Sequence, residues 1–275
     1  MGAVYGSLAL ALVMIHRSTG LVNFAQGEMA MLSTYLAWSL VQAGAPYWVA
    51  FAATIGISFL CGFAVHWGLM KPLTRAPHIA TTIVFVGMIL IINSLAGWLF
   101  TYSVQSFPSP FSNFVSIPGY FSSHELGAIA VMLLVLLTLL LFFRLTTFGL
   151  KMRGAAENPL SSRLLGIRVD LMLATGWGIA AAVGAVGGMM VAPILYLDPN
   201  MMSGVLLYGF AAALIGGINN PAGAVAGGLI VGVMENAVAF LVGSEVKLTA
   251  ALLVIVATMI LRPAGIFSRV VTRRV

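Results

Sequence analysis

Long runs of apolar residues, separated by short polar links, make up almost all of this sequence. No Lys, Arg, Asp or Glu occurs in residues 44–70, 76–124, 126–143, 171–197 or 199–234. A helix needs ~20 apolar residues to cross the ~30 Å hydrocarbon core of a bilayer, and several of these runs could cross it twice. The pattern predicts an all-α fold, a polytopic transmembrane helix bundle of about eight or nine spans.

The predicted spans cover most of the chain. They lie near residues 3–15, 24–42, 47–69, 79–100, 125–143, 172–196, 203–218, 222–242 and 248–262. Strands of a membrane barrel alternate apolar and polar residues, whereas segments such as 129–143 are apolar on nearly every face. The first span has only ~14 apolar residues before Arg17, fewer than a crossing needs, so we expect further residues to precede Met1.

Charge is scarce and unevenly placed. Charged residues make up 7% of the chain and hydrophobic residues 61%, whereas soluble proteins carry about 25% charged residues. Basic residues gather at 71–75, 144–168 and 262–274, while the link at 101–124 has none. Positive residues mark the cytoplasmic side, so we expect the basic links and the C-terminus inside and 101–124 outside. This placement explains the net charge of +6 without nucleic acid as a partner.

Small residues indicate how the helices pack. Glycines four residues apart, which let helix backbones approach closely in lipid, occur at Gly184 and Gly188, Gly223 and Gly227, and Gly228 and Gly232. The single cysteine, Cys61, lies in an apolar run and is predicted to be a small buried side chain. We therefore expect a single transmembrane domain over residues 1–275.

Two carboxylates fall inside predicted spans. Glu28 lies near the start of the second span and Glu235 within the eighth. Placing an ionisable group in lipid costs ~2.5–3.5 kcal/mol on insertion scales, so each of these carboxylates is expected to have a functional or structural role. Two interpretations stay open, a polar translocation path and hydrogen bonds that pin helices together. The candidate residues for either role are Asn23, Glu28, Asn93, Glu235 and Asn236.

Enzyme signatures are missing from the sequence. It has no GxxxxGK phosphate-binding loop and no HExxH motif. The four histidines lack metal-ligand spacing. We therefore predict a non-catalytic chain with no cofactor and no metal site.

The basic link at about 147–170 holds a short predicted helix. Asn158 is a suitable N-cap and Pro159 suits the first helical position, while Gly166 closes the helix. Leu160, Leu164 and Leu165 are spaced to form one apolar side. A solvated loop with positive-inside charge is the alternative.

Three ordered motifs resemble the permeases of branched-chain amino-acid (LIV-type) ABC transporters. Residues 19–28, TGLVNFAQGE, are similar to the N-terminal TGxxNFAxGE pattern of that family. Residues 147–167 resemble its coupling loop. Residues 210–232 resemble its C-terminal GGxxxxxGAxxGG signature. The resemblance runs from about residue 6 to 267, with Gln26 where His is common in the family.

The resemblance implies a permease subunit of a binding-protein-dependent importer in the cell (inner) membrane. Its implied partners are a homologous second permease, two cytoplasmic ATPase subunits that hydrolyse ATP, an external substrate-binding protein and the lipid bilayer. The substrate is expected to be a branched-chain or related amino acid, with urea or short amides as alternatives. Residues implied in ATPase coupling are Arg153, Glu157, Asn158, Leu160, Leu164, Leu165 and Gly166.

Two other classes remain alternatives. An ion-coupled secondary carrier needs coupling carboxylates at the midplane, for which Glu28 and Glu235 are the candidates. A structural or assembly membrane protein needs neither. The coupling loop discriminates, because neither alternative requires it.

Overall fold

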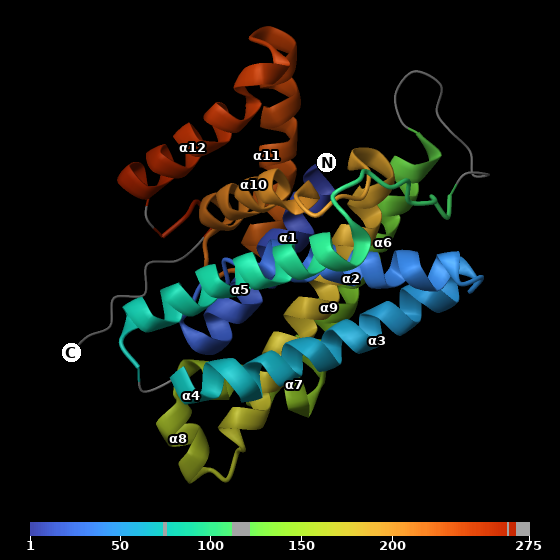
Figure 1. Ribbon diagram of the computed structural model, residues 1–275. Coiled ribbons are helices and arrows are strands. Elements are labelled where there is room, and N and C mark those ends of the chain that lie inside the picture. The colour runs from blue at the N-terminus through green and yellow to red at the C-terminus, as the bar shows by residue number, and fades with distance from the viewer. Residues whose placement is uncertain (74–75, 112–121, 263, 268–275) are drawn as a thin grey trace.

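The structure is a computed structural model that describes residues 1–73, 76–111, 122–262 and 264–267. The order of elements is α1 (Gly2–Thr19), α2 (Gln26–Gln42), α3 (Tyr47–Val65), the π-helix η1 (His66–Met70), α4 (Lys71–Leu73), α5 (His78–Phe100), α6 (Ser123–Leu145), α7 (Thr147–Glu157), α8 (Pro159–Leu164), α9 (Val169–Leu195), α10 (Met201–Gly216), α11 (Pro221–Leu241), the 3₁₀-helix η2 (Ser244–Val246) and α12 (Lys247–Leu261). The fold is all-helical as predicted, and each of the nine predicted spans corresponds to a helix (Figure 1).

Six helical rods in the described chain are long and apolar enough to cross a membrane. They are Tyr47–Leu73, Ile79–Phe100, Ser123–Leu145, Val169–Leu195, Pro221–Leu241 and Ser244–Leu261. The predicted eight or nine spans are therefore too many by this measure. At 1.5 Å per residue, the 17 residues of α2 and the 16 of α10 fall short of a ~30 Å core.

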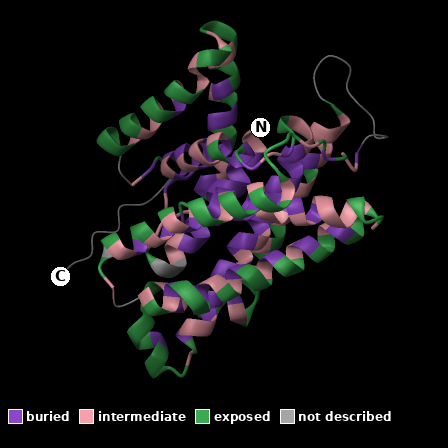
Figure 2. Cartoon of the chain, viewed as in Figure 1, coloured by how far each residue is buried: buried purple, intermediate pink, exposed green. Residues whose placement is uncertain are grey.

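α1 and α9 form the centre of the bundle. α1 packs against α9, α10 and α11, and α9 also packs against α2 and α3. Side chains of both helices, such as Leu8 and Trp177, have no exposed surface, and Figure 2 shows buried residues concentrated around them. α1 can therefore be shorter than the bilayer is thick, because protein rather than lipid surrounds most of it.

Glycines set the close approach of these helices. A Cβ on Gly228 of α11 would meet the backbone of Gly6 in α1, and one on Gly227 would meet the carbonyl of Ala212 in α10. On α9, a Cβ at Gly188 would meet Thr34 of α2. The glycine pairs thus bring helix backbones close together in the core of the bundle, as their spacing predicts.

The outer helices expose apolar side chains. α5, α6 and α12 have few buried residues although they are strongly apolar, which is typical of surfaces that meet lipid or another membrane subunit. Cys61 belongs to such a face of α3 and is exposed, so the prediction of a buried cysteine is wrong. A uniformly apolar helix does not reveal from its sequence which side faces the bundle. Figure 1 shows α12 at the upper left and α8 at the lower left of the view.

Candidate functional site

Two residues of the loop before α2 are buried within the bundle. Asn23 and Ala25 have no exposed surface, and the Oδ1 of Asn23 accepts a hydrogen bond from the backbone N–H of Ala25 at 3.0 Å. The side chain of Asn23 also donates to the Oε1 of Gln26 at 3.1 Å. Gln26 in turn donates to the carbonyl of Ala180 in α9 at 3.0 Å. Asn23 therefore holds the start of a helix that begins inside the protein.

A chain of polar groups leads from this helix start to the protein surface. Glu28, in the first turn of α2, is buried, and its Oε2 lies 3.5 Å from the Nδ2 of Asn93 in α5. The same Nδ2 donates to the carbonyl of Pro199 at 2.9 Å and lies 3.2 Å from the Oδ1 of the exposed Asn200. The hydroxyl of Tyr102, also exposed, donates to the Oδ1 of Asn93 at 3.3 Å. Glu28 and Asn93 are thus brought together, as members of one cluster.

Glu235 belongs to a different cluster. Its Oε2 accepts a hydrogen bond from the hydroxyl of Tyr5 in α1 at 2.7 Å, and its Oε1 lies 3.3 Å from the Nζ of Lys247 in α12. Tyr5 also stacks on Tyr208 of α10, with ring centroids 4.8 Å apart. The carboxylate therefore joins α1, α11 and α12, while its neighbour Asn236 is exposed.

The short helix of the basic link has the predicted caps. The Oδ1 of Asn158 accepts from the N–H of Ser161 at 3.0 Å, Pro159 occupies the first turn, and Gly166 follows the helix with φ +75°. The preceding residues form a second helix, α7, which was predicted only as part of the link. Arg153 lies on α7 and lines a cavity, whereas Glu157 ends α7 and is exposed.

Three leucines at α8 face away from the protein. Leu160, Leu164 and Leu165 are 71%, 83% and 80% exposed, which is unusual for large apolar side chains beside a polar link. Figure 2 shows α8 as an exposed projection from the bundle. Exposed apolar side chains grouped on one short helix are typical of a surface that another protein covers.

Asp170, which was not among the predicted site residues, connects α8 to the membrane-spanning helices. Its Oδ2 lies 3.2 Å from the Nζ of Lys71 at the end of the α3 rod, and its Oδ1 lies 3.6 Å from Arg163 of α8. Lys71 also sits over the ring of Trp67, 3.8 Å from its centroid. The π-helix η1 lies immediately before Lys71, and π-helical turns occur frequently at functional sites. One acidic residue at the end of a basic link was the only signal in the sequence.

No group of three or more metal-ligating side chains occurs among the residues that the structure describes.

The two polar clusters also contain residues that were not predicted as site residues, among them Tyr5, Lys247, Tyr102 and Asn200. In the sequence a tyrosine counts as an apolar residue of a span, and Lys247 is a single basic residue just before the last predicted span.

A family model and several known relatives match this chain over most of its length. The family model described as "Branched-chain amino acid transport system / permease component" matches residues 1–262. LivH, a high-affinity branched-chain amino acid transport system permease protein of Escherichia coli K12, is 26% identical and covers 98% of this chain and 92% of its own. BraD of Pseudomonas aeruginosa, a permease protein described in the same words, is 28% identical, with 98% and 93% covered. No solved structure matches the chain.

Proposed function

The chain belongs to the family of branched-chain amino acid transport permeases, and from this premise we propose that it imports leucine, isoleucine, valine or related amino acids. It is a membrane-embedded permease of an ABC importer. The observation that carries the proposal is the family match over residues 1–262, which includes the buried α2 start, the link with α8 and the glycine-rich α11. The names of the relatives LivH and BraD supply the substrate class.

The importer needs partners that supply energy and substrate. The sequence has no GxxxxGK phosphate-binding loop, so ATP is bound and hydrolysed elsewhere and the chain itself is non-catalytic. We infer two cytoplasmic ATPase subunits, a homologous second permease and an external substrate-binding protein. The apolar faces of α3, α5 and α12 provide surface for the second permease and for lipid.

α8 is the proposed docking element for an ATPase subunit. Its exposed leucines would fill an apolar groove in the motor, since interface energy concentrates in a few buried anchors. Glu157 and Arg163 are exposed beside them and would lie at the rim. Asn158 and Gly166 fix the two ends of α8. The resemblance also implies Arg153 in ATPase coupling. In the structure Arg153 lines a cavity, so its part in docking stays a prediction.

Movement of α8 would reach the membrane through Asp170. The carboxylate contacts Arg163 on α8 and Lys71 at the end of the α3 rod, and it belongs to α9 itself. Coupling requires contacts that differ between two states of the protein. Ion pairs at 3.2 and 3.6 Å with partly exposed partners can exchange at low cost.

The polar chain from Glu28 through Asn93 to Asn200 is the proposed part of the translocation path. Asn23 supports it by fixing the start of α2 inside the bundle, as in transporters whose broken helices end near the substrate. For Glu235 the ion pair with Lys247 and the bond from Tyr5 favour helix pinning, and the exposed Asn236 beside it would meet lipid or the second permease. Because Glu235 is paired with Lys247, Glu28 is the remaining candidate carboxylate for an ion-coupled carrier.

The orientation follows from the basic residues. Arg17, Lys71, Arg144 and the α7–α8 link belong to the cytoplasmic side by the positive-inside rule. The C-terminus then lies in the cytoplasm, and the protein is a multi-pass component of the cell (inner) membrane. The C-terminal arginines after residue 267 and Arg75 lie outside the described residues.

Reconstitution tests the proposed function. The chain is placed in proteoliposomes with its second permease and ATPases, and uptake of labelled leucine is measured with the binding protein outside and ATP inside. We expect uptake that requires ATP and the binding protein and that persists when ionophores collapse proton and sodium gradients. Uptake driven by an ion gradient without ATP would contradict the proposal.

A further inference from the structure

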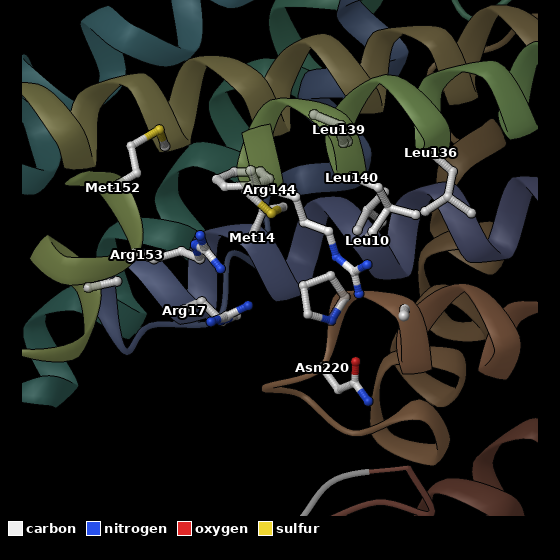
Figure 3. Close-up of a pocket in the computed structure, with 14 residues that line it drawn as sticks. Leu10, Met14, Arg17, Leu136, Leu139, Leu140, Arg144, Met152, Arg153 and Asn220 are labelled. Carbon is white, nitrogen blue, oxygen red and sulfur yellow. The ribbon is translucent and has the colours of Figure 1, made fainter. Parts of the chain in front are cut away.

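A cavity of about 220 Å³ opens between α1, α6, α7 and the start of α11 (Figure 3). It belongs neither to the polar chain at Glu28 nor to the leucine surface of α8. Its lining includes Arg17, Arg144 and Arg153, together with apolar residues such as Met14, Leu136 and Leu140. Basic and apolar residues share the lining, and no acidic residue is among them.

Three arginines from three helices define its polar part. Arg17 lies in the last turn of α1, Arg144 in the last turn of α6, and Arg153 on α7. Figure 3 shows the side chains of Arg17 and Arg153 at the α7 end and that of Arg144 directed toward α11. Like charges brought together by separate helices are unfavourable unless an anion compensates them.

The protein itself supplies little compensation. Within the described parts of the chain, no carboxylate forms an ion pair with any of the three arginines, although Glu157 attracts Arg17 electrostatically. The Nε of Arg153 is buried and has no hydrogen-bond partner among the residues that the structure describes. A buried guanidinium nitrogen without a partner is costly, so this atom points to an acceptor that a ligand would provide.

The start of α11 adds to the positive potential. Asn220, the N-cap, accepts from the N–H of Gly223 at 3.1 Å and donates to the carbonyl of Phe267 at 2.8 Å. Pro221 and Ala222 bring the first turn of α11 to the cavity wall. The N-terminus of a helix carries a partial positive charge that favours anions.

The apolar part extends from the arginines along the bundle. On α6 the wall runs back from Arg144 to Leu136, and on α1 from Arg17 to Leu10. At 1.5 Å per residue these stretches are about 10–12 Å long. Both run from the basic end of the helices toward the middle of the membrane, as acyl chains do beneath a headgroup. A soluble anion would gain nothing from this wall.

We propose that this cavity binds the phosphate of an anionic phospholipid from the cytoplasmic leaflet. The phosphate oxygens accept hydrogen bonds from Arg17, Arg144 and Arg153, including the unpartnered Nε, and an acyl chain lies along Leu136, Leu139 and Leu140. Basic pockets between membrane helices on the cytoplasmic side suit such headgroups. The bound lipid would join α1 and α6 to α7, directly before the docking helix α8.

Native mass spectrometry of the purified full-length chain tests this site. Equal amounts of phosphatidylglycerol and phosphatidylcholine are offered, and the retained lipid is counted. We expect preferential retention of phosphatidylglycerol, reduced about five-fold by Arg153→Gln. Lys151→Gln, which removes the same charge from the same helix outside the cavity, is the matched control and should bind as the unmodified chain does. Equal retention of both lipids, or equal loss in both variants, would overturn the proposal.

Two further measurements separate the alternatives. Ala156→Phe fills the cavity without changing its charge and should also reduce lipid retention. Unchanged retention in this variant contradicts the site. Displacement of phosphatidylglycerol by millimolar inorganic phosphate would mean that a soluble anion is the ligand. Gel filtration shows whether each variant is folded, and loss of ATPase co-purification by Arg153→Gln with lipid binding intact would mean that the arginine serves docking instead.

Discussion

The Nζ of Lys71 lies 3.2 Å from the Oδ2 of Asp170, which joins the end of the α3 rod to the first turn of α9. The second carboxylate oxygen of Asp170 contacts Arg163 on α8 at 3.6 Å. The helix with the exposed leucines is thus tied to two membrane-spanning helices through one carboxylate. The proposed coupling of ATP hydrolysis to transport would use this arrangement as a short path from a soluble ATPase to helices in lipid.

Asp170→Asn should lower transport without unfolding the protein. Partly exposed ion pairs contribute roughly 0.2–1 kcal/mol each, so losing both should cost about 1 kcal/mol, roughly a five-fold decrease in ATP-driven uptake. Uptake in proteoliposomes and the thermal unfolding temperature are measured together. Glu245→Gln, an exposed acid outside this network, is the control, and uptake of Asp170→Asn equal to that control would contradict the coupling path.

Glu28→Gln should impair transport and leave the complex assembled. Removing the charge weakens the contact with Asn93, because hydrogen bonds to ionised groups are the stronger ones. We expect uptake to fall on the order of ten-fold, equivalent to about 1.4 kcal/mol. Co-purification of the partner subunits is the companion measurement. If the subunits separate instead, Glu28 holds the structure together and does not line a path.

Glu235→Gln should act on stability. The amine of Lys247 would lose its counter-charge in a largely buried setting, which costs about 1–3 kcal/mol. We expect a lower unfolding temperature in detergent, partly recovered when Lys247→Met is added. Transport per folded molecule should stay close to normal. A folded Glu235→Gln protein with no transport would assign Glu235 to the path.

Cysteine labelling tests the orientation. Cys61 is exposed, so it is first replaced by serine. Val104→Cys and Ser161→Cys then place single thiols at exposed positions in the 101–111 segment and in α8. An impermeant reagent added outside intact cells should label residue 104 and not residue 161. Labelling of both from the same side contradicts the threading.

Much of the fold was predictable because apolar runs longer than ~17 residues have few other solutions. The positions of all nine predicted helices are confirmed. Which helices face lipid was not predictable, since this depends on partners distant in the sequence. α1 and α10 are short and surrounded by protein, and Cys61 lies on the outer side of a helix that is apolar all round.

The capping of α8 could be predicted from Asn158, Pro159 and Gly166, because caps depend on local geometry. The polar clusters around Glu28 and Glu235 could not be predicted in this way. Glu28 and Asn93 are 65 residues apart, and Tyr5 and Glu235 are 230 apart. In the sequence, Asp170 follows several basic residues and looks like part of an ordinary solvated link. Only the fold places Lys71 beside it.

The most direct test of the proposed coupling is the effect of Leu164→Asp on ATPase recruitment. Leu164 is 83% exposed, so a carboxylate there does not disturb the folded chain but cannot enter an apolar groove. Leu150→Asp, the same change at an exposed leucine of α7, is the matched control. We expect Leu164→Asp to insert normally, to lose co-purification of the ATPase and to lose uptake, while Leu150→Asp retains both. Full uptake by Leu164→Asp would mean that the motor docks elsewhere and that α8 does not transmit its motion.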